Sequence, residues 1–195
     1  VNLAGGLHHA LPRRASGFCL VNDPAVAIAY ARAREDVRVL YVDLDAHHGD
    51  GVQWIFYEDP RVLTLSIHES GRYLFPGTGD ILERGHGPGK GFSVNLPLEP
   101  GTPADSWLEC LTMMLEALAE AFRPDLVVSQ HGCDAHHLDP LTHLDLTVDA
   151  LEEGARLVRE VAETWADGRW VALGGGGYDI WRVVPRAWTL VWCQV

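Results

Sequence analysis

Cysteine is scarce in this sequence, and basic segments, long apolar runs and signal-like segments are missing from it. The four cysteines stand far apart without a CxxC pair in a chain of 195 residues. A disulfide scaffold is therefore not expected, and a reducing compartment is the simpler interpretation. No apolar run is long enough to span a bilayer, and no signal peptide is visible. These features predict a cytoplasmic protein that does not enter a membrane.

The charge balance is strongly acidic, with 15 Lys and Arg against 27 Asp and Glu and a net charge of −12. General affinity for nucleic-acid phosphates is therefore not expected. The composition, 47% hydrophobic and 22% charged, predicts one globular domain over residues 1–195. The sequence starts at VNLAGGLHHA without Met and stops within an apolar pattern at WTLVWCQV, so we expect an internal segment of a longer protein.

The most informative stretch runs from Tyr41 to Gly51 and reads YVDLDAHHGDG. It begins as an apolar strand, and Asp43, Asp45 and His47 then follow at every second position. In an extended chain these three side chains point to one face. Carboxylates and imidazole at the end of a buried strand suit a divalent metal of the zinc type. A solvated loop after a strand is the alternative.

Strands and helices alternate along the rest of the chain. We predict strands at 37–42, 62–68, 92–98, 126–129 and 170–173. We predict helices at 23–34, 51–57, 104–122, 147–165 and from 180 to the end. The strands lack polar alternation, which indicates a parallel sheet covered on both faces. The glycine- and proline-rich residues 69–90 are expected to form a long ordered loop that shapes a site.

Polar residues collect where four of these strands end. Besides the stretch described above, they are Ser66 and His68, the HGCD segment 131–134 and the GGGGY segment 174–178. In open α/β sheets ligands bind beyond the carboxyl ends of the strands. The sequence therefore places its chemistry at the edge that this topology favours.

A catalytic metal needs at least three protein ligands. Asp45 and His47 supply two, and Asp134 is the best third, arriving from a different strand. His131 competes for that role, although a histidine packed at a strand end is the simpler interpretation. Two further histidines of that loop are expected at solvent-facing or rim positions: His136 and His137.

The tandem His8 and His9 could accept and donate protons near neutral pH. Asp43 and Asp50 remain available to fix their tautomers once Asp45 binds the metal. A HisHis pair alone would equally suit a surface position. The four glycines before Tyr178 let its phenol approach a ligand closely, where it could donate to an oxyanion. This run is neither a phosphate loop nor a dinucleotide fingerprint.

Six motifs occur in a specific order over essentially the whole chain: GGLHHA, GFCLVND, YVDLDAHHGDG, LFPGTGD, QHGCDAHHLDPL and GGGGY. In this order they resemble the zinc-dependent histone deacetylase family, and most closely its bacterial members of the acetoin-utilisation type. The resemblance implies an arginase-like, three-layer α/β fold with a mainly parallel sheet, incomplete at both ends. It also implies a single deacetylase catalytic domain, whose site lies at the end of a narrow tunnel.

The resemblance assigns roles residue by residue. It implies a zinc ion, with iron(II) as the alternative, held by three ligands: Asp45, His47 and Asp134. It makes His9 the general base and acid, with His8 as electrostatic support. Asp43 would orient His8, Asp50 would orient His9, and Tyr178 would carry the transition-state hydroxyl.

The same resemblance implies structural potassium and a substrate tunnel. The first potassium site would use Asp43, Ser66 and the carbonyls of Asp45, His47 and Ile67. A second would use the carbonyls of Phe56, Asp59, Val62 and Phe92. The tunnel would be walled by Gly17, Phe18, Phe75, Leu141 and Gly176. Burying the stem of an acetyl-lysine contributes about 0.8 kcal/mol per methylene.

The implied reaction removes acetyl groups from protein lysine or from small acetylated amines, and three alternatives stay open. An arginase-type enzyme would use two manganese ions, with Asp43 and Asp50 as extra ligands, but His8, His9 and Tyr178 favour one zinc. An acetylpolyamine deacetylase would favour an acidic gatekeeper, and Leu141 gives no support for one. The third alternative is a binding protein that keeps the pocket but does not catalyse the reaction. Full members of the family are longer at both ends, so the resemblance also allows a non-catalytic fragment.

Overall fold

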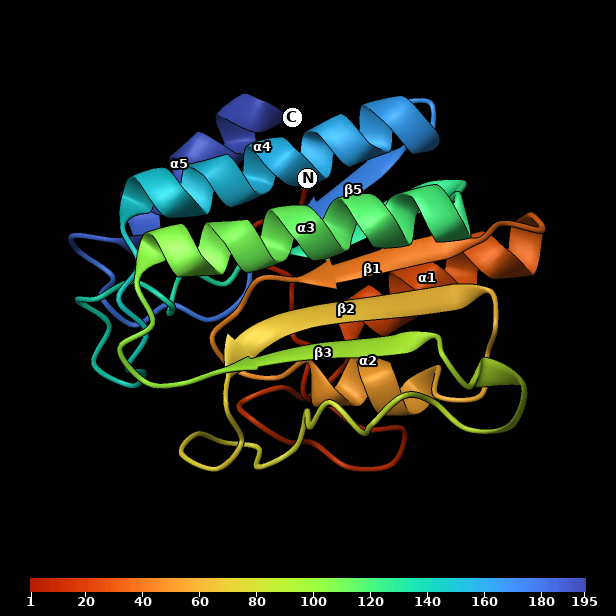
Figure 1. Cartoon of the computed structure of the whole chain (residues 1–195), viewed down its shortest axis with the longest axis horizontal. Helices are drawn as coiled ribbons and strands as arrows, with labels where there is room; N and C mark the ends of the chain where they lie inside the picture. Colours follow the sequence, from red (N-terminus) through yellow and green to blue (C-terminus); the bar gives the residue numbers. More distant parts are fainter.

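The computed structural model describes all residues from 1 to 195, and its centre is a five-stranded parallel sheet (Figure 1). The strand order is β3-β2-β1-β4-β5. The strands are β1 Val39–Asp43, β2 Val62–Glu69, β3 Ser93–Leu98, β4 Leu126–Gln130 and β5 Trp170–Leu173. The predicted parallel α/β architecture is confirmed, and each strand lies within two residues of its predicted bounds.

Strand β1 occupies the middle of the sheet, and all five of its residues are buried. Its last residue, Asp43, is in register with Ser66 of β2 and Gln130 of β4. Continuous burial explains why the strand is apolar up to Asp43, because both faces are covered. The chain leaves β1 at the carboxyl edge of the sheet, where neighbouring strands also deliver polar side chains.

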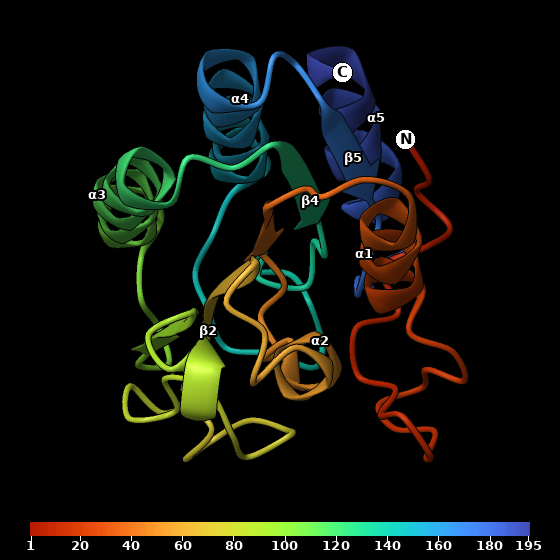
Figure 2. The ribbon, with the colours of Figure 1, turned by 90° about the vertical axis from the view of Figure 1, so that its right-hand side faces the viewer.

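Helices cover both faces, which gives the three layers seen end-on in Figure 2. The helices are α1 Asp23–Arg34, α2 Asp50–Ile55, α3 Ala104–Phe122, α4 Val148–Trp165 and α5 Val184–Gln194, with a short 3-10 turn η1 Gly87–Gly89. One face packs against α3 and α4 in the largest apolar cluster, and α5 lies against α4. The other face packs against α1 and α2.

Two helix starts illustrate how local sequence fixes these bounds. Asn22 accepts a hydrogen bond from the Ala25 amide at 2.9 Å, which caps α1 as its sequence predicts. Helix α5 begins at Val184 rather than at residue 180, so that predicted start was wrong. Pro185 lies in the first turn of α5, where its missing amide costs no hydrogen bond. The preceding residues instead form a turn around Asp179, which accepts from the Arg182 amide at 2.9 Å.

No helix of this structure combines the length and hydropathy that a membrane-spanning segment needs.

Candidate metal centre

Asp45, His47 and Asp134 meet at the carboxyl edge of the sheet, with the first two directly after β1 and the third after β4. One potential ligand atom from each lies within 4.8 Å of the others, and all three residues are buried. The Nδ1 atom of His47 is 2.8 Å from Asp134 Oδ2 and 3.1 Å from Asp45 Oδ1. The structure thus brings together the three residues predicted as metal ligands.

The electrostatics of these three residues suit a divalent cation. Burial and the neighbouring Asp45 carboxylate raise the pKa of Asp134 to about 7. Burial opposes a charge on His47, yet its hydrogen bonds to Asp134 and Asp45 raise its pKa to about 11. Two buried carboxylates are costly without a compensating cation. An oxygen–nitrogen–oxygen donor set with three protein ligands matches a catalytic zinc-type site.

The carboxylates are held by donors around them. Gln130 Nε2 and the Gly176 amide each donate to Asp45 Oδ2 at 2.8 Å. The Ala46 amide donates to Asp134 Oδ1 at 2.8 Å. Gln130 was not identified from the sequence, because its place beside Asp43 depends on the register between β1 and β4, which the sequence does not show.

Two glycines allow the chain to approach these carboxylates. A Cβ atom at Gly132 would lie 2.0 Å from Asp45 Oδ2, and one at Gly176 would lie 2.3 Å from Asp134 Oδ2. Both distances are far below van der Waals contact, so any side chain there would displace a candidate ligand. Gly176, one of the four glycines before Tyr178, therefore lies directly against the candidate metal ligands.

The tandem histidines form two buried histidine–aspartate pairs. His8 Nδ1 lies 2.8 Å from Asp43 Oδ2, and His9 Nδ1 lies 2.6 Å from Asp50 Oδ1. Burial alone would lower the pKa of His8, but Asp43 and the nearby Asp45 raise it to about 9. Burial and the charge of His8 lower the pKa of His9. The pair therefore combines one charged and one neutral imidazole near neutral pH.

A cavity of about 250 Å³ opens onto this cluster. It is lined by both histidines, Asp45, His47, Tyr178, Gly17, Phe18 and Gly176, among others. Burial and the nearby Asp134 raise the pKa of Tyr178, which keeps its phenol protonated. Phe18 lies edge-on to the Tyr178 ring at 6.2 Å between centroids, and Phe75 lies edge-on to His9 at 5.0 Å. Of the predicted tunnel residues, Phe75 and Leu141 are outside this lining, and Leu141 is exposed on its loop.

The remaining histidines of the HGCD loop have other surroundings. His131 is turned to Ser129, with Nε2 2.7 Å from its hydroxyl, and it is not part of the metal cluster. His137 is exposed. The prediction of a solvent-facing or rim position was wrong for His136, which is 95% buried. It stacks on His137 at 4.3 Å, and its Nδ1 accepts from the Leu138 amide, so the loop folds back over it.

The first set of residues predicted for potassium lies beside the metal centre, whereas the second set lies at the opposite edge of the sheet, where β2 and β3 begin. Asp43 accepts from the Tyr41 hydroxyl at 2.6 Å, and Ser66 Oγ lies 2.9 Å from His68 Nδ1. In the second set, the carbonyls of Phe56, Asp59 and Phe92 accept hydrogen bonds from the amides of Asp59, Val62 and Thr64.

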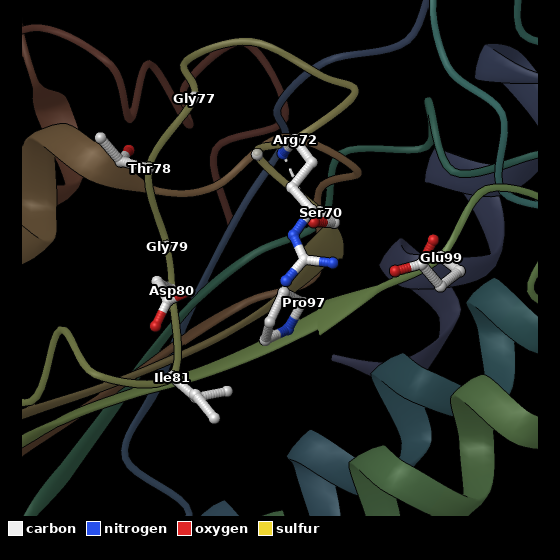
Figure 3. A pocket seen from close by; sticks show the side chains of 10 residues that line it. Ser70, Arg72, Gly77, Thr78, Gly79, Asp80, Ile81, Pro97 and Glu99 are labelled. Atoms are coloured by element: carbon white, nitrogen blue, oxygen red, sulfur yellow. Dashed lines mark hydrogen bonds between the residues drawn. The ribbon is translucent and has the colours of Figure 1, made fainter.

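A separate polar cavity of about 300 Å³ lies next to the loop that follows β2 (Figure 3). Arg72 extends into it between residues 77–81 and the end of β3, while Asp80 and Glu99 border it. It shares no lining residue with the cavity at the histidines. Its mixture of charges and lack of a metal-ligand cluster distinguish it from the candidate centre.

The fold and the site together define a class: an α/β protein with one buried carboxylate–imidazole metal centre beside two histidine–aspartate pairs. Comparison with known proteins identifies the family within this class. The histone deacetylase domain model matches residues 1–195, and the chain belongs to this family. This confirms the resemblance inferred from the motifs.

Individual relatives agree with that assignment. The acetoin utilization protein AcuC of Bacillus subtilis (strain 168) is 56% identical over 194 residues, covering 100% of this chain and 50% of the relative. AcuC of Staphylococcus xylosus is 50% identical over 190 residues, covering 97% of this chain and 49% of the relative. The structure of a histone deacetylase homologue from Aquifex aeolicus is similar with a TM-score of 0.91 and 44% identity, covering 98% of this chain and 50% of that one. The structure of a histone deacetylase homologue complexed with SAHA is similar with a TM-score of 0.92 and 44% identity, again covering 98% of this chain and 50% of that one. The chain thus spans about half the length of the relatives it matches.

Proposed function

We propose that this chain carries the catalytic centre of a metal-dependent deacetylase, which hydrolyses N-acetylated amines to acetate and the free amine. The observation that carries the proposal is the cluster of Asp45, His47 and Asp134, whose first two members line one cavity with His9 and Tyr178. Family membership supports the same reaction class. The substrate proposed is acetyl-lysine in protein or a small acetylated amine of similar shape.

We propose zinc as the metal, with iron(II) as the alternative, because two carboxylates and one imidazole suit either ion. A zinc ion held there would supply Lewis-acid polarisation of an amide carbonyl and lower the pKa of a water molecule. The proposed ligands are Asp45, His47 and Asp134. Potassium beside Asp43 and Ser66 is proposed as a structural companion, supported by the buried carboxylate at that position.

The protein's own groups then divide the proton transfers. His9 is held through Nδ1 by Asp50, which leaves Nε2 to accept a proton from the attacking water. His8 carries positive charge in its contact with Asp43 and stabilises the negative charge that develops nearby. Tyr178 donates its hydroxyl hydrogen bond to the carbonyl oxygen as that oxygen becomes negative. The proton held by histidine passes to the amine nitrogen as its bond to the acetyl carbon breaks.

Two exposed aromatic rings, one against Tyr178 and one against His9, suit an extended apolar substrate stem. Phe18 is 86% exposed and Phe75 is 48% exposed, so both rings are free to pack on methylenes. Burying such a stem contributes about 0.8 kcal/mol per methylene.

All four cysteines are free in the structure, which supports the proposal that the protein acts in the reducing cytoplasm.

The test is hydrolysis of a small fluorogenic acetyl-lysine peptide by the complete natural protein that contains these residues. We expect release of acetate that stops with a chelator and returns with added zinc. An acetylated diamine assayed in parallel separates protein-like from polyamine-like substrates. A protein that binds zinc yet releases no acetate from either would contradict the proposal and favour a binding role.

A further inference from the structure

Tyr178 follows four glycines and therefore depends on neighbouring segments for its position. Glycine has the largest backbone freedom of any residue, so a glycine run is ordered only where its backbone is anchored. Gly174 and Gly176 are anchored, because their carbonyls accept from the amides of His131 and Cys133 at 3.1 and 2.7 Å. No hydrogen bond is made by the phenol hydroxyl of Tyr178, so the ring is positioned by its backbone and by its edge-on contact with Phe18.

The backbone anchor at Tyr178 itself is Asp139. The Tyr178 amide donates to Asp139 Oδ2 at 2.8 Å, across 39 positions of sequence. The same carboxylate accepts from the Leu141 amide through Oδ1 at 3.0 Å. Asp139 is 8% exposed, and its own amide donates to the His136 carbonyl at 2.8 Å. One buried carboxylate thus ties the segment carrying the phenol to the loop carrying Leu141.

The chain is fixed equally firmly just after Tyr178. Asp179 accepts from the Arg182 amide at 2.9 Å and from its Nε atom at 2.6 Å, and the Asp179 carbonyl receives the Val183 amide at 3.1 Å. Tyr178 therefore lies between a turn that leads into α5 and the carboxylate of Asp139. Removing the Asp139 contact would release one of these two ends and leave the ring free to swing.

We propose that Asp139 is a positioning residue for the reaction, which holds the Tyr178 hydroxyl where the reacting carbonyl oxygen develops its charge. The inference rests on the proposed function. Asp139 acts through Tyr178 and does not touch the metal cluster: neither of its oxygens contacts Asp45, His47 or Asp134 in a hydrogen bond. Its contribution is therefore confined to the step in which the phenol stabilises charge.

The test is a double-mutant cycle on turnover in the complete natural protein. Asp139→Asn keeps the shape of the side chain but leaves one oxygen for two amide donors. We expect kcat to fall about tenfold, which is about 1.4 kcal/mol in activation free energy, with KM changed less than about twofold. In a Tyr178→Phe background the same substitution should change kcat by less than about twofold, because the group it positions is already gone.

Two further variants separate positioning from folding. Asp139→Ser retains a short hydroxyl acceptor for the local turn to Leu141, while it loses the reach to Tyr178, so it should reproduce the fall in kcat. Asp80→Asn is the matched control, because the carboxylate of Asp80 accepts only from the nearby Leu82 amide at 2.8 Å, and kcat should stay unchanged. Amide hydrogen exchange of residues 174–180 in the metal-free protein should become faster in the two Asp139 variants and stay unchanged in the control.

The possible outcomes distinguish failure of the Asp139 anchor from failure of the proposed deacetylase function. An additive effect of Asp139→Asn and Tyr178→Phe, or full turnover in Asp139→Ser, would overturn the inference while leaving the proposed deacetylase intact. Full turnover in Tyr178→Phe alone would remove the phenol from the mechanism, and the inference would fall with it. A wild-type protein without deacetylase activity would count against the proposed function, whereas unchanged amide exchange in the Asp139 variants would count against the anchor alone.

Discussion

The Nδ1 atom of His9 lies 2.6 Å from Oδ1 of Asp50, and both side chains are buried. A histidine that donates from Nδ1 keeps Nε2 free as an acceptor, so the aspartate selects the tautomer that a general base needs. Burial and the adjacent charge of His8 lower the pKa of His9, which keeps it neutral at pH 7. The tandem histidines therefore differ in protonation although each has an aspartate partner.

Asp50→Asn should lower kcat about 10- to 100-fold, because the asparagine no longer fixes the tautomer or supports the imidazolium formed during the reaction. The loss should be smaller than that of His9→Ala. Steady-state kinetics with an acetyl-lysine peptide measure both. Asp36→Asn, at an exposed aspartate that pairs with Arg61, serves as the control. Equal turnover in Asp50→Asn and wild type would show that Asp50 does not assist His9.

Tyr178→Phe should lower kcat by about 100- to 1,000-fold, the effect of removing one donor to a developing oxyanion. The substitution leaves the aromatic contact with Phe18 in place, so KM should change little. Zinc content, measured by elemental analysis, should match that of the wild type because Tyr178 is not among the three clustered ligands. A variant that loses both turnover and zinc would place Tyr178 in the metal centre.

Gly176→Ala should weaken metal binding, since the new Cβ atom would lie 2.3 Å from Asp134 Oδ2 and 2.9 Å from Asp45 Oδ2. The affinity of the protein for zinc, measured by competition with a chelator, should fall at least about tenfold. Gly91→Ala is the comparison: Gly91 has φ +96° with nothing near its Cβ position, so that variant should lose stability but not zinc. Wild-type zinc affinity in Gly176→Ala would mean that the glycine run is not needed there.

His131 should make the metal-free protein sensitive to acid. Burial lowers the pKa of His131 to about 3, below its ordinary value of 6.5. Between these values the unfolded chain binds a proton that the folded chain does not, so stability falls as pH falls from 6.5 towards 3. His131→Gln should remove up to about 1.4 kcal/mol per pH unit of that slope. Urea unfolding at several pH values measures it, and an unchanged slope would contradict the neutral, buried state of His131.

The sequence predicts those features that leave a pattern along the chain. The apolar run before Asp43 predicts the central strand, and the spacing of Asp45 and His47 predicts a shared face, because strand geometry repeats every two residues. The third candidate ligand, Asp134, follows from parallel topology, which gathers the ends of strands at one edge. These inferences need only short-range regularity and a rule about sheets.

Contacts between loops leave no such pattern. The bond from Tyr178 to Asp139 joins a side chain to a backbone amide 39 positions away, and the burial of His136 depends on how its loop folds back. Gln130 supports Asp45 from a neighbouring strand across 85 positions. Each arises from the packing of segments whose own sequences permit many conformations, so only the three-dimensional structure reveals it.

The central claim is that Asp45, His47 and Asp134 hold a single ion. Titration of the metal-free protein with zinc, followed by calorimetry, measures it most directly. We expect one ion per chain in the wild type and in His131→Gln, and loss of that binding in Asp134→Ala. Two ions per chain, or undiminished zinc binding in Asp134→Ala, would contradict the account.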